Sequence, residues 1–234
     1  MIAICKREIR SFFNSPVGYV CIAALAALYG YYYYLVMAIG STSYISAVYQ
    51  TMFSFSMMII PIITMKSMSD DQKNKTDQAL LTAPVGVTSI VVGKFLACFF
   101  VFFVASTLGL LPAAAMSFFS SPSWGEIIGN YLGTLLYGGA MVSIGVFISS
   151  LTISQIIAAI GTFVVSVFLM YIDTLGGAVS SDAVATVVDW ISFNNRYTTF
   201  TQGLFSISST VFFLSVIAVF IFLTARRLES RRWS

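Results

Sequence analysis

The 234-residue sequence contains no histidine. Ser–His and Cys–His nucleophiles are therefore excluded, and the commonest side-chain ligand of transition metals is missing. Cysteine is scarce as well, and Cys5, Cys21 and Cys98 are too scattered to match a metal-binding spacing. We therefore expect no catalytic residue, no metal centre and no cofactor in this chain, and we interpret the cysteines as small apolar side chains in helix packing.

Charged residues are also scarce. Charged residues make up 9% of the chain and hydrophobic residues 58%, with a mean hydropathy of +0.91, whereas soluble domains carry about 25% charged residues. A helix needs about 20 apolar residues to cross a hydrocarbon core. Because the apolar runs are apolar on every face, they are helices rather than barrel strands. We predict an all-α integral membrane fold with six transmembrane helices, at residues 17–39, 44–65, 88–118, 127–149, 152–172 and 208–224.

The basic residues predict the orientation of these helices. If the N-terminus is cytoplasmic, eleven of the twelve Lys and Arg residues fall on the cytoplasmic side, and Arg196 falls outside. This bias predicts cytosolic N- and C-termini. The net charge of +3 is then a signal of orientation and does not indicate nucleic acid binding. The run 17–39 is too long for the apolar region of a signal peptide, so we expect it to be retained.

Residues 1–16 are amphipathic and predict an interfacial elbow helix. Such a helix lies in the headgroup plane, with its apolar stripe among the acyl chains and its cations near anionic lipid. A basic flank that only fixes topology is the alternative. The residues that we assign to the elbow are Lys6, Arg7, Arg10, Phe12 and Phe13.

Three further segments have local patterns. The glycines of run 127–149 predict close helix packing within the chain, or, as the sharper alternative, a dimer seam. Pro61 and Pro112 are expected to bend their helices. The outer loop 173–207 predicts a short extracytoplasmic helix after Asp182, which either lids a translocation path or shields helix ends. Aromatic residues of this loop suit the membrane interface: Trp190, Phe193, Tyr197 and Phe200.

An energy source within the chain is not evident. Ion-coupled transporters carry ionisable groups inside their spans, but the nine acidic residues here lie at run ends or in loops. Gly93 and Lys94 resemble the end of a phosphate-binding loop, yet Thr88 replaces its first glycine and Phe95 replaces the residue that holds magnesium. If the protein does work, we expect the energy to come from another polypeptide.

Residues 69–82 gather an unusual share of the charge. Ser69 with Gln72 fits a capping box, Asp70 and Asp71 would then fall in the first turn, and Pro84 follows the end. The pattern predicts a cytosolic helix of about three turns between the second and third spans. A solvated connector whose charges only fix topology is the alternative.

The stretch "DDQKNKTDQALLTAPVGVTSIVVGKFLA" resembles the segment after the second span of type-2 ABC transporter (ABC-2-type) permeases. The N-terminal "CKREIRSFFNSPVGYV" is similar to the elbow of that family, and "FLTARRLESRRW" resembles the ending of its gliding-motility-type subfamily. Lys75 departs from the pattern where glycine is usual, and Gln78 where glutamate is frequent. The matching positions of the charged stretch are Asp70, Asp71, Lys73, Thr76, Leu80, Leu81, Pro84, Gly93 and Lys94.

This resemblance implies a permease that is not itself an enzyme. A separate cytosolic ABC ATPase subunit, acting as a dimer and carrying ATP and Mg, would grip the 69–82 segment as a coupling helix. A second permease chain would complete the complex, as a homodimer or with a related or auxiliary subunit. A membrane scaffold for a surface or motility complex and an ATP-independent channel are the alternative functions. The expected contacts of the ATPase subunit are Asp70, Asp71, Lys73, Thr76, Asp77, Leu80, Leu81 and Pro84.

Overall fold

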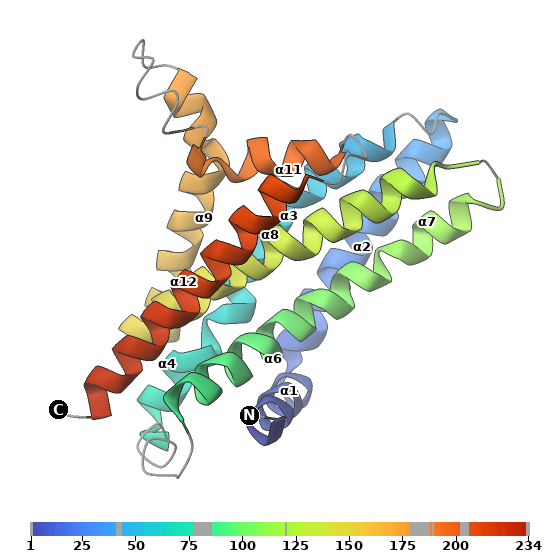
Figure 1. Cartoon of the computed structure of the whole chain (residues 1–234). Helices are drawn as coiled ribbons and strands as arrows, with labels where there is room; N and C mark the ends of the chain where they lie inside the picture. The colour runs from blue at the N-terminus through green and yellow to red at the C-terminus, as the bar shows by residue number, and fades with distance from the viewer. Residues whose placement is uncertain are drawn as a thin grey trace.

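The computed structural model describes residues 2–40, 44–76, 86–119, 121–177, 188, 190–201 and 206–232. These residues form helices and no strand (Figure 1). Most of the helix expected after Asp182 lies outside the described residues. So do four of the expected contacts of the ATPase subunit: Asp77, Leu80, Leu81 and Pro84. The helices are α1 (Ile2–Asn14), α2 (Pro16–Ile39), α3 (Ile45–Thr64), α4 (Lys66–Lys73), α6 (Val87–Leu108), α7 (Leu110–Met116), α8 (Trp124–Leu151), α9 (Gln155–Gly177), α11 (Phe193–Thr201) and α12 (Ile207–Arg232).

Six helical segments of the described chain are long and apolar enough to cross a membrane, so the predicted all-α fold with six spans is confirmed. Two of these segments are built from two helices each. α3 passes through Met65 into α4 with helical backbone angles (φ −54°, ψ −37°), and α6 passes through Gly109 into α7. Four single helices supply the other candidate spans: α2, α8, α9 and α12.

α8 is the centre of the bundle (Figure 1). It packs against α3, α6, α9, α11 and α12. Within its most apolar stretch 72% of the residues are buried, against 17% for α12. In a bilayer both classes of helix are apolar, so burial by neighbours rather than hydrophobicity separates the core helix from the peripheral ones. A displacement of α8 therefore reaches most of the bundle.

Glycines let α8 approach its neighbours closely. A Cβ at Gly138 would lie 2.1 Å from Cε1 of Phe102 in α6, and a Cβ at Gly145 would lie 2.3 Å from Oγ1 of Thr64 in α3. Gly133 meets the ring of Phe200 in α11 in the same way. These glycines serve contacts within the chain, which favours the intramolecular interpretation of the glycine pattern.

Each of the two prolines lies inside a helix that continues past it. α3 continues helically past Pro61 to Thr64, and the Met65 N–H donates to the Pro61 carbonyl over 3.0 Å. The break between α6 and α7 lies at Gly109, three residues before Pro112. Pro112 has no N–H to donate to the carbonyl of Leu108, the last residue of α6, so the break lies where this proline removes a helical hydrogen bond. Close packing also marks the junction, because a Cβ at Gly109 would lie 2.6 Å from the Tyr29 ring.

An aromatic cluster fills the bundle beneath α11. Phe53 lies 4.8 Å from the ring of Tyr137 and 5.1 Å from the ring of Tyr197, measured between ring centroids. The Tyr197 hydroxyl donates to the Tyr49 carbonyl over 3.4 Å. The interface position predicted for three aromatic residues of the outer segment is wrong, because Phe193, Tyr197 and Phe200 are buried in the core. Trp190, in contrast, is 70% exposed.

The glycine contacts of α8 predict the effect of a single methyl group. We expect Gly145→Ala to lower the free energy of unfolding by about 1–3 kcal/mol, because the stiff, buried Thr64 leaves no room for the added carbon. Thermal unfolding of the purified protein in detergent measures the effect. The control is Gly30→Ala, where the added Cβ meets nothing within 4 Å. Equal melting temperatures for the two variants would contradict this packing account.

Candidate functional site

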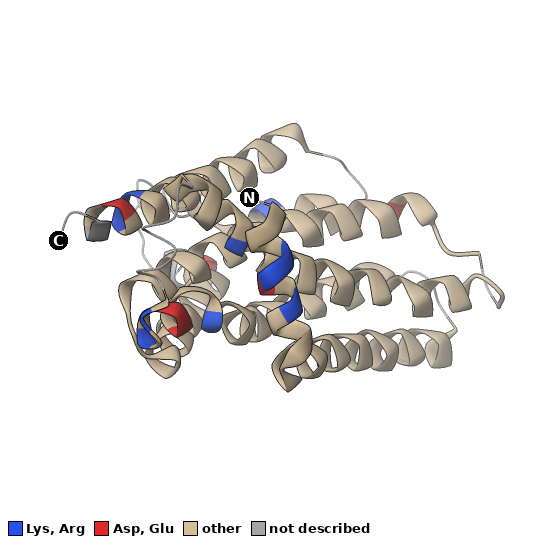
Figure 2. Cartoon of the chain, turned by 90° about the horizontal axis from the view of Figure 1, so that it is seen from below, with Lys and Arg blue, Asp and Glu red and all other residues tan. Residues whose placement is uncertain are grey.

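Most of the charges of the described residues gather at one end of the bundle, and the exceptions are Glu126, Asp173 and Arg196 (Figure 2). We name this end the basic end, and it contains α1, α4 and the last part of α12. Figure 2 shows α1 running across the direction of the long helices. A short helix in this orientation lies along the surface of a membrane that the long helices cross.

α4 begins earlier than the sequence predicts. Its first residue is Lys66, so Ser69 lies inside the helix and its Oγ donates to the Met65 carbonyl instead of capping a helix start. The predicted capping box is therefore wrong, because the helical backbone at Met65 carries α3 directly into α4 and no new N-cap is needed. Asp70 and Asp71 consequently fall in the second turn.

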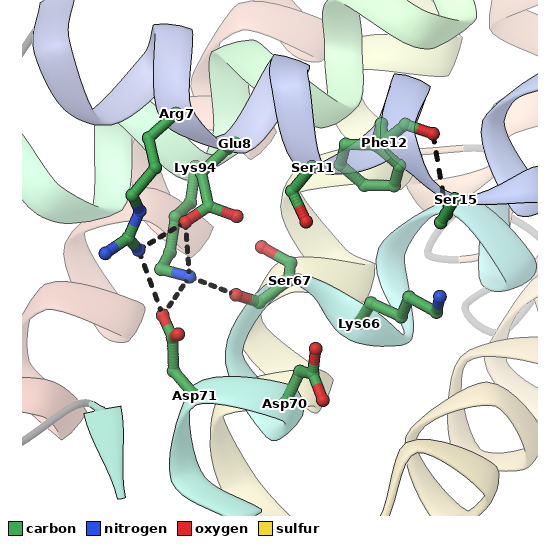
Figure 3. A pocket seen from close by; sticks show the side chains of 10 residues that line it. All are labelled: Arg7, Glu8, Ser11, Phe12, Ser15, Lys66, Ser67, Asp70, Asp71 and Lys94. Atoms are coloured by element: carbon green, nitrogen blue, oxygen red, sulfur yellow. Dashed lines mark hydrogen bonds and ion pairs between the residues drawn. The ribbon is translucent and has the colours of Figure 1, made fainter. Parts of the chain in front are cut away.

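Lys94 of α6 is the centre of an ion cluster that joins three helices (Figure 3). Its Nζ lies 2.5 Å from Oδ2 of Asp71 in α4 and 3.3 Å from Oε1 of Glu8 in α1. It also donates to the Ser67 carbonyl. Arg7 completes the cluster, with Nη2 at 2.6 Å from Glu8 Oε1 and 3.5 Å from Asp71 Oδ2. Two cations thus face two carboxylates, and the cluster is electrically balanced.

Burial makes Lys94 the dominant member of this cluster. Its side chain is 2% exposed, whereas that of Arg7 is 48% exposed and its ion pairs are screened by water. Removing one partner of a buried pair costs about 3–5 kcal/mol, because the remaining charge stays buried without compensation. The attachment of α1 and α4 to α6 therefore depends mainly on the ammonium of Lys94.

Glu8 contributes to the raised pKa values of two groups in α1. The hydrogen bond to Glu8 is the largest cause that raises the pKa of Arg7 above its ordinary value. Burial, followed by the charge of Glu8, raises the pKa of the Cys5 thiol. Cys5 therefore stays protonated at neutral pH, which agrees with its interpretation as a packing residue.

Hydrogen bonds attach the opposite side of α4 to α8 and α9. Oγ of Ser149 accepts the N–H groups of Met68 and Ser69, each over 3.1 Å, and donates to the Met65 carbonyl. Nε2 of Gln72 donates to the Ser150 carbonyl over 3.0 Å, and Nε2 of Gln155 donates to Oδ1 of the Asp70 carboxylate over 2.7 Å. α4 is therefore held by ion pairs on one side and by hydrogen bonds without ion pairs on the other.

The chain after α4 is exposed. Lys73 and Thr76 are exposed, and Thr76 Oγ1 donates to Asp71 Oδ1 over 2.7 Å. Lys75 has φ of +56°, and it is the non-glycine residue with positive φ in the described part of the chain. Glycine adopts this left-handed conformation without steric cost. The departure at Lys75 from the glycine of the family pattern thus falls where a glycine would be favoured.

Of the predicted contact residues that the structure describes, two are bonded to other helices and two are exposed. Asp71 turns inward to Lys94, and Asp70 bonds Gln155, so both serve contacts within the chain. Lys73 and Thr76 remain available to a partner. Sequence reasoning missed the roles of Glu8 and Ser149. The signal for Glu8 was present, because a lysine within an apolar run, such as Lys94, needs an acid at the same depth.

The predicted elbow residues are also divided. Lys6 and Arg10 are exposed, as an interfacial helix requires. Phe12, which we expected among acyl chains, is instead 5% exposed in the protein core, because α1 packs against α6 and α2. Phe13 is half-buried, and its ring meets that of Tyr19 edge-on at 5.5 Å.

The ion cluster predicts a large effect of a substitution at Lys94. We expect Lys94→Met to lower the free energy of unfolding by about 3–5 kcal/mol, because Glu8 and Asp71 lose their buried counter-ion. Thermal unfolding in detergent measures this loss, and Lys73→Met, on the exposed end of α4, is the matched control. A Lys94→Met variant that melts with this control would show that the cluster does not hold α1 and α4.

A comparison with known protein families identifies the family of this chain. A family model described as ABC-2 family transporter protein matches residues 2–233, which is almost the whole chain. No curated protein matches the chain. The match agrees with the six candidate spans. The chain is therefore a multi-pass membrane protein of the ABC-2 transporter family.

Proposed function

We propose that the chain is the transmembrane permease subunit of an ATP-driven ABC exporter. The observation that carries this proposal is the attachment of α4, which is bonded to α1 and α6 on one side and to α8 and α9 on the other. A helix fixed on two sides transmits an applied displacement to both. Membership of the ABC-2 family supports the proposal, because its members are membrane subunits of transporters.

The energy for transport comes, in this proposal, from a separate nucleotide-binding subunit. ATP and Mg are held by that subunit and not by this chain. The partner contacts the exposed end of α4 at Lys73 and Thr76, together with the residues that follow it along the chain. The resemblance to ABC-2 permeases assigns the remaining contacts to Asp77, Leu80, Leu81 and Pro84.

Two routes carry the displacement of α4 into the membrane. The ionic route passes from Asp71 through Lys94 to α6 and through Glu8 to α1. The hydrogen-bonded route passes from the backbone of α4 through Ser149 to α8 and from Asp70 through Gln155 to α9. Because α8 contacts most of the bundle, the hydrogen-bonded route reaches the core of the protein.

The location and assembly follow from the same proposal. The basic end faces the cytosol of a bacterium, since the ATPase needs cytosolic ATP and the bias of Lys and Arg favours that side. Both termini are then cytosolic in the cytoplasmic membrane. ATPase subunits act as a dimer, so a second permease chain is required, either a copy of this one or a related subunit. The gliding-motility-type subfamily remains a prediction from the resemblance of the C-terminal segment.

Substitutions beyond α4 test the contact with the ATPase subunit. We expect Leu80→Asp combined with Leu81→Asp to reduce the nucleotide-hydrolysing chain that copurifies from native membranes by about tenfold, because a charge replaces two apolar contact side chains. Mass spectrometry and ATPase activity of the purified complex measure this loss.

Lys6→Glu is the matched control, since it changes charge at the basic end but away from α4. Equal recovery of the nucleotide-hydrolysing chain with the double variant and with this control would contradict the assigned contact. Complete absence of such a chain from wild-type preparations would instead favour a membrane scaffold.

A further inference from the structure

Two hollows meet at the basic end between α1, α2, α3 and α4. The first, which we name the polar hollow, has a volume of about 200 Å³ and includes Ser11, Ser15 and Lys66 in its lining (Figure 3). The second, which we name the apolar groove, has a volume of about 190 Å³. Its lining consists of Pro16, Val17, Val20, Cys21 and Ala24 of α2 with Ile59 and Ile62 of α3.

The linings of the two hollows contain residues that are neighbours in the sequence. Ser15 of the polar hollow directly precedes Pro16 of the apolar groove. Ile62 of the groove lies four residues before Lys66 of the hollow, across the helical junction at Met65. A helical separation of four residues places two side chains on the same face. The polar hollow therefore lies at the mouth of the apolar groove.

The polar hollow contains one cation without an ion pair in the described part of the chain, Lys66, in a lining whose three cations and three carboxylates balance. Its other basic residues, Arg7 and Lys94, are paired within the ion cluster, and Asp70 bonds Asn74 and Gln155. Lys66 has no ion pair or hydrogen bond among the described residues. Figure 3 shows its side chain extending toward Ser15 at the start of α2. An ammonium with neighbouring hydroxyl groups suits a phosphate oxygen.

The apolar groove opens toward the bilayer. Val20 is 62% exposed and Ile62 is 43% exposed, and both belong to helices that are long and apolar enough to span the membrane. In a membrane, a groove on this surface is filled by a hydrocarbon chain. The arrangement of a phosphate-binding cation above an apolar groove is complementary to a phospholipid and to no purely soluble ligand.

We propose that this place is a binding site for one anionic phospholipid of the leaflet at the basic end. The phosphate of the lipid binds Lys66 with Ser11 and Ser15, and an acyl chain lies in the apolar groove. Lys66 is the first residue of α4 and precedes Ser67, whose carbonyl accepts a hydrogen bond from Lys94. The bound lipid therefore contacts the same helix that the ion cluster holds. The proposal goes beyond the transport function and depends on the membrane location alone.

A lipid titration of the purified chain tests this site without any ATPase subunit. The protein in detergent is titrated with phosphatidylglycerol, and bound lipid is counted by native mass spectrometry. We expect Lys66→Gln to weaken binding about fivefold, the effect of one lysine near an anionic lipid surface. Lys6→Gln, an exposed cation of α1 outside the polar hollow, controls for attraction to the surface in general.

A second pair of variants tests the apolar groove. Ala24→Phe places a ring in the groove and is expected to weaken lipid binding about fivefold, whereas Ala27→Phe adds the same ring on the exposed side of α2. Each variant is first checked for a single monodisperse species. If Ala24→Phe does not fold, the lysine pair decides the result.

Three results would overturn the proposal. The first is equal binding by Lys66→Gln and Lys6→Gln. The second is equal binding by well-folded Ala24→Phe and Ala27→Phe. The third is displacement of the lipid by glycerol phosphate at matching concentrations, which would identify a site for free phosphate instead of a lipid. Each outcome is independent of ATP coupling, so failure here leaves the transport proposal untouched.

Discussion

The buried ammonium of Lys94 is the interaction on which the arrangement of the basic end depends. It lies in an apolar helix and is almost free of solvent, so it is tolerated only with carboxylates beside it. Those carboxylates come from two different helices, Glu8 of α1 and Asp71 of α4. A charge that must be compensated thus helps to fix the positions of two short helices, which also bury apolar side chains such as Phe12 and Met68.

The same constraint explains how a helix of eight residues can act on a bundle of long ones. α4 continues α3 through the helical backbone at Met65, and its attachments fix where this end of the segment lies. Ion pairs bind it to α1 and α6, and Ser149 and Gln155 bind it to α8 and α9. Close contacts at Gly138 and Gly145 then join α8 to α6 and α3 without flexible side chains between them. A displacement of α4 therefore meets stiff connections in several directions.

The sequence predicted the number and helical nature of the spans because an apolar run of sufficient length has one stable form in a bilayer. Prediction from the sequence failed for side chains whose position depends on a contact with a distant part of the chain. Phe12 and Tyr197 have the composition of interface residues, yet both are buried by helices that are distant in sequence. Ser69 has the pattern of an N-cap, yet α3 continues through Met65, and no local signal reports that continuity. Lys94 was visible as a charge in an apolar run, but its acids at positions 8 and 71 could be paired with it only in three dimensions.

The central claim is that the exposed end of α4 receives force from a nucleotide-hydrolysing polypeptide. A photo-crosslinking amino acid at Thr76, activated in native membranes, tests this contact directly, and the same amino acid at the exposed Ile160 of α9 is the control. The account predicts a crosslink from position 76 to a nucleotide-hydrolysing chain, and none to that chain from position 160. Crosslinks from position 76 that contain no such chain, in membranes where the protein is intact, would contradict it.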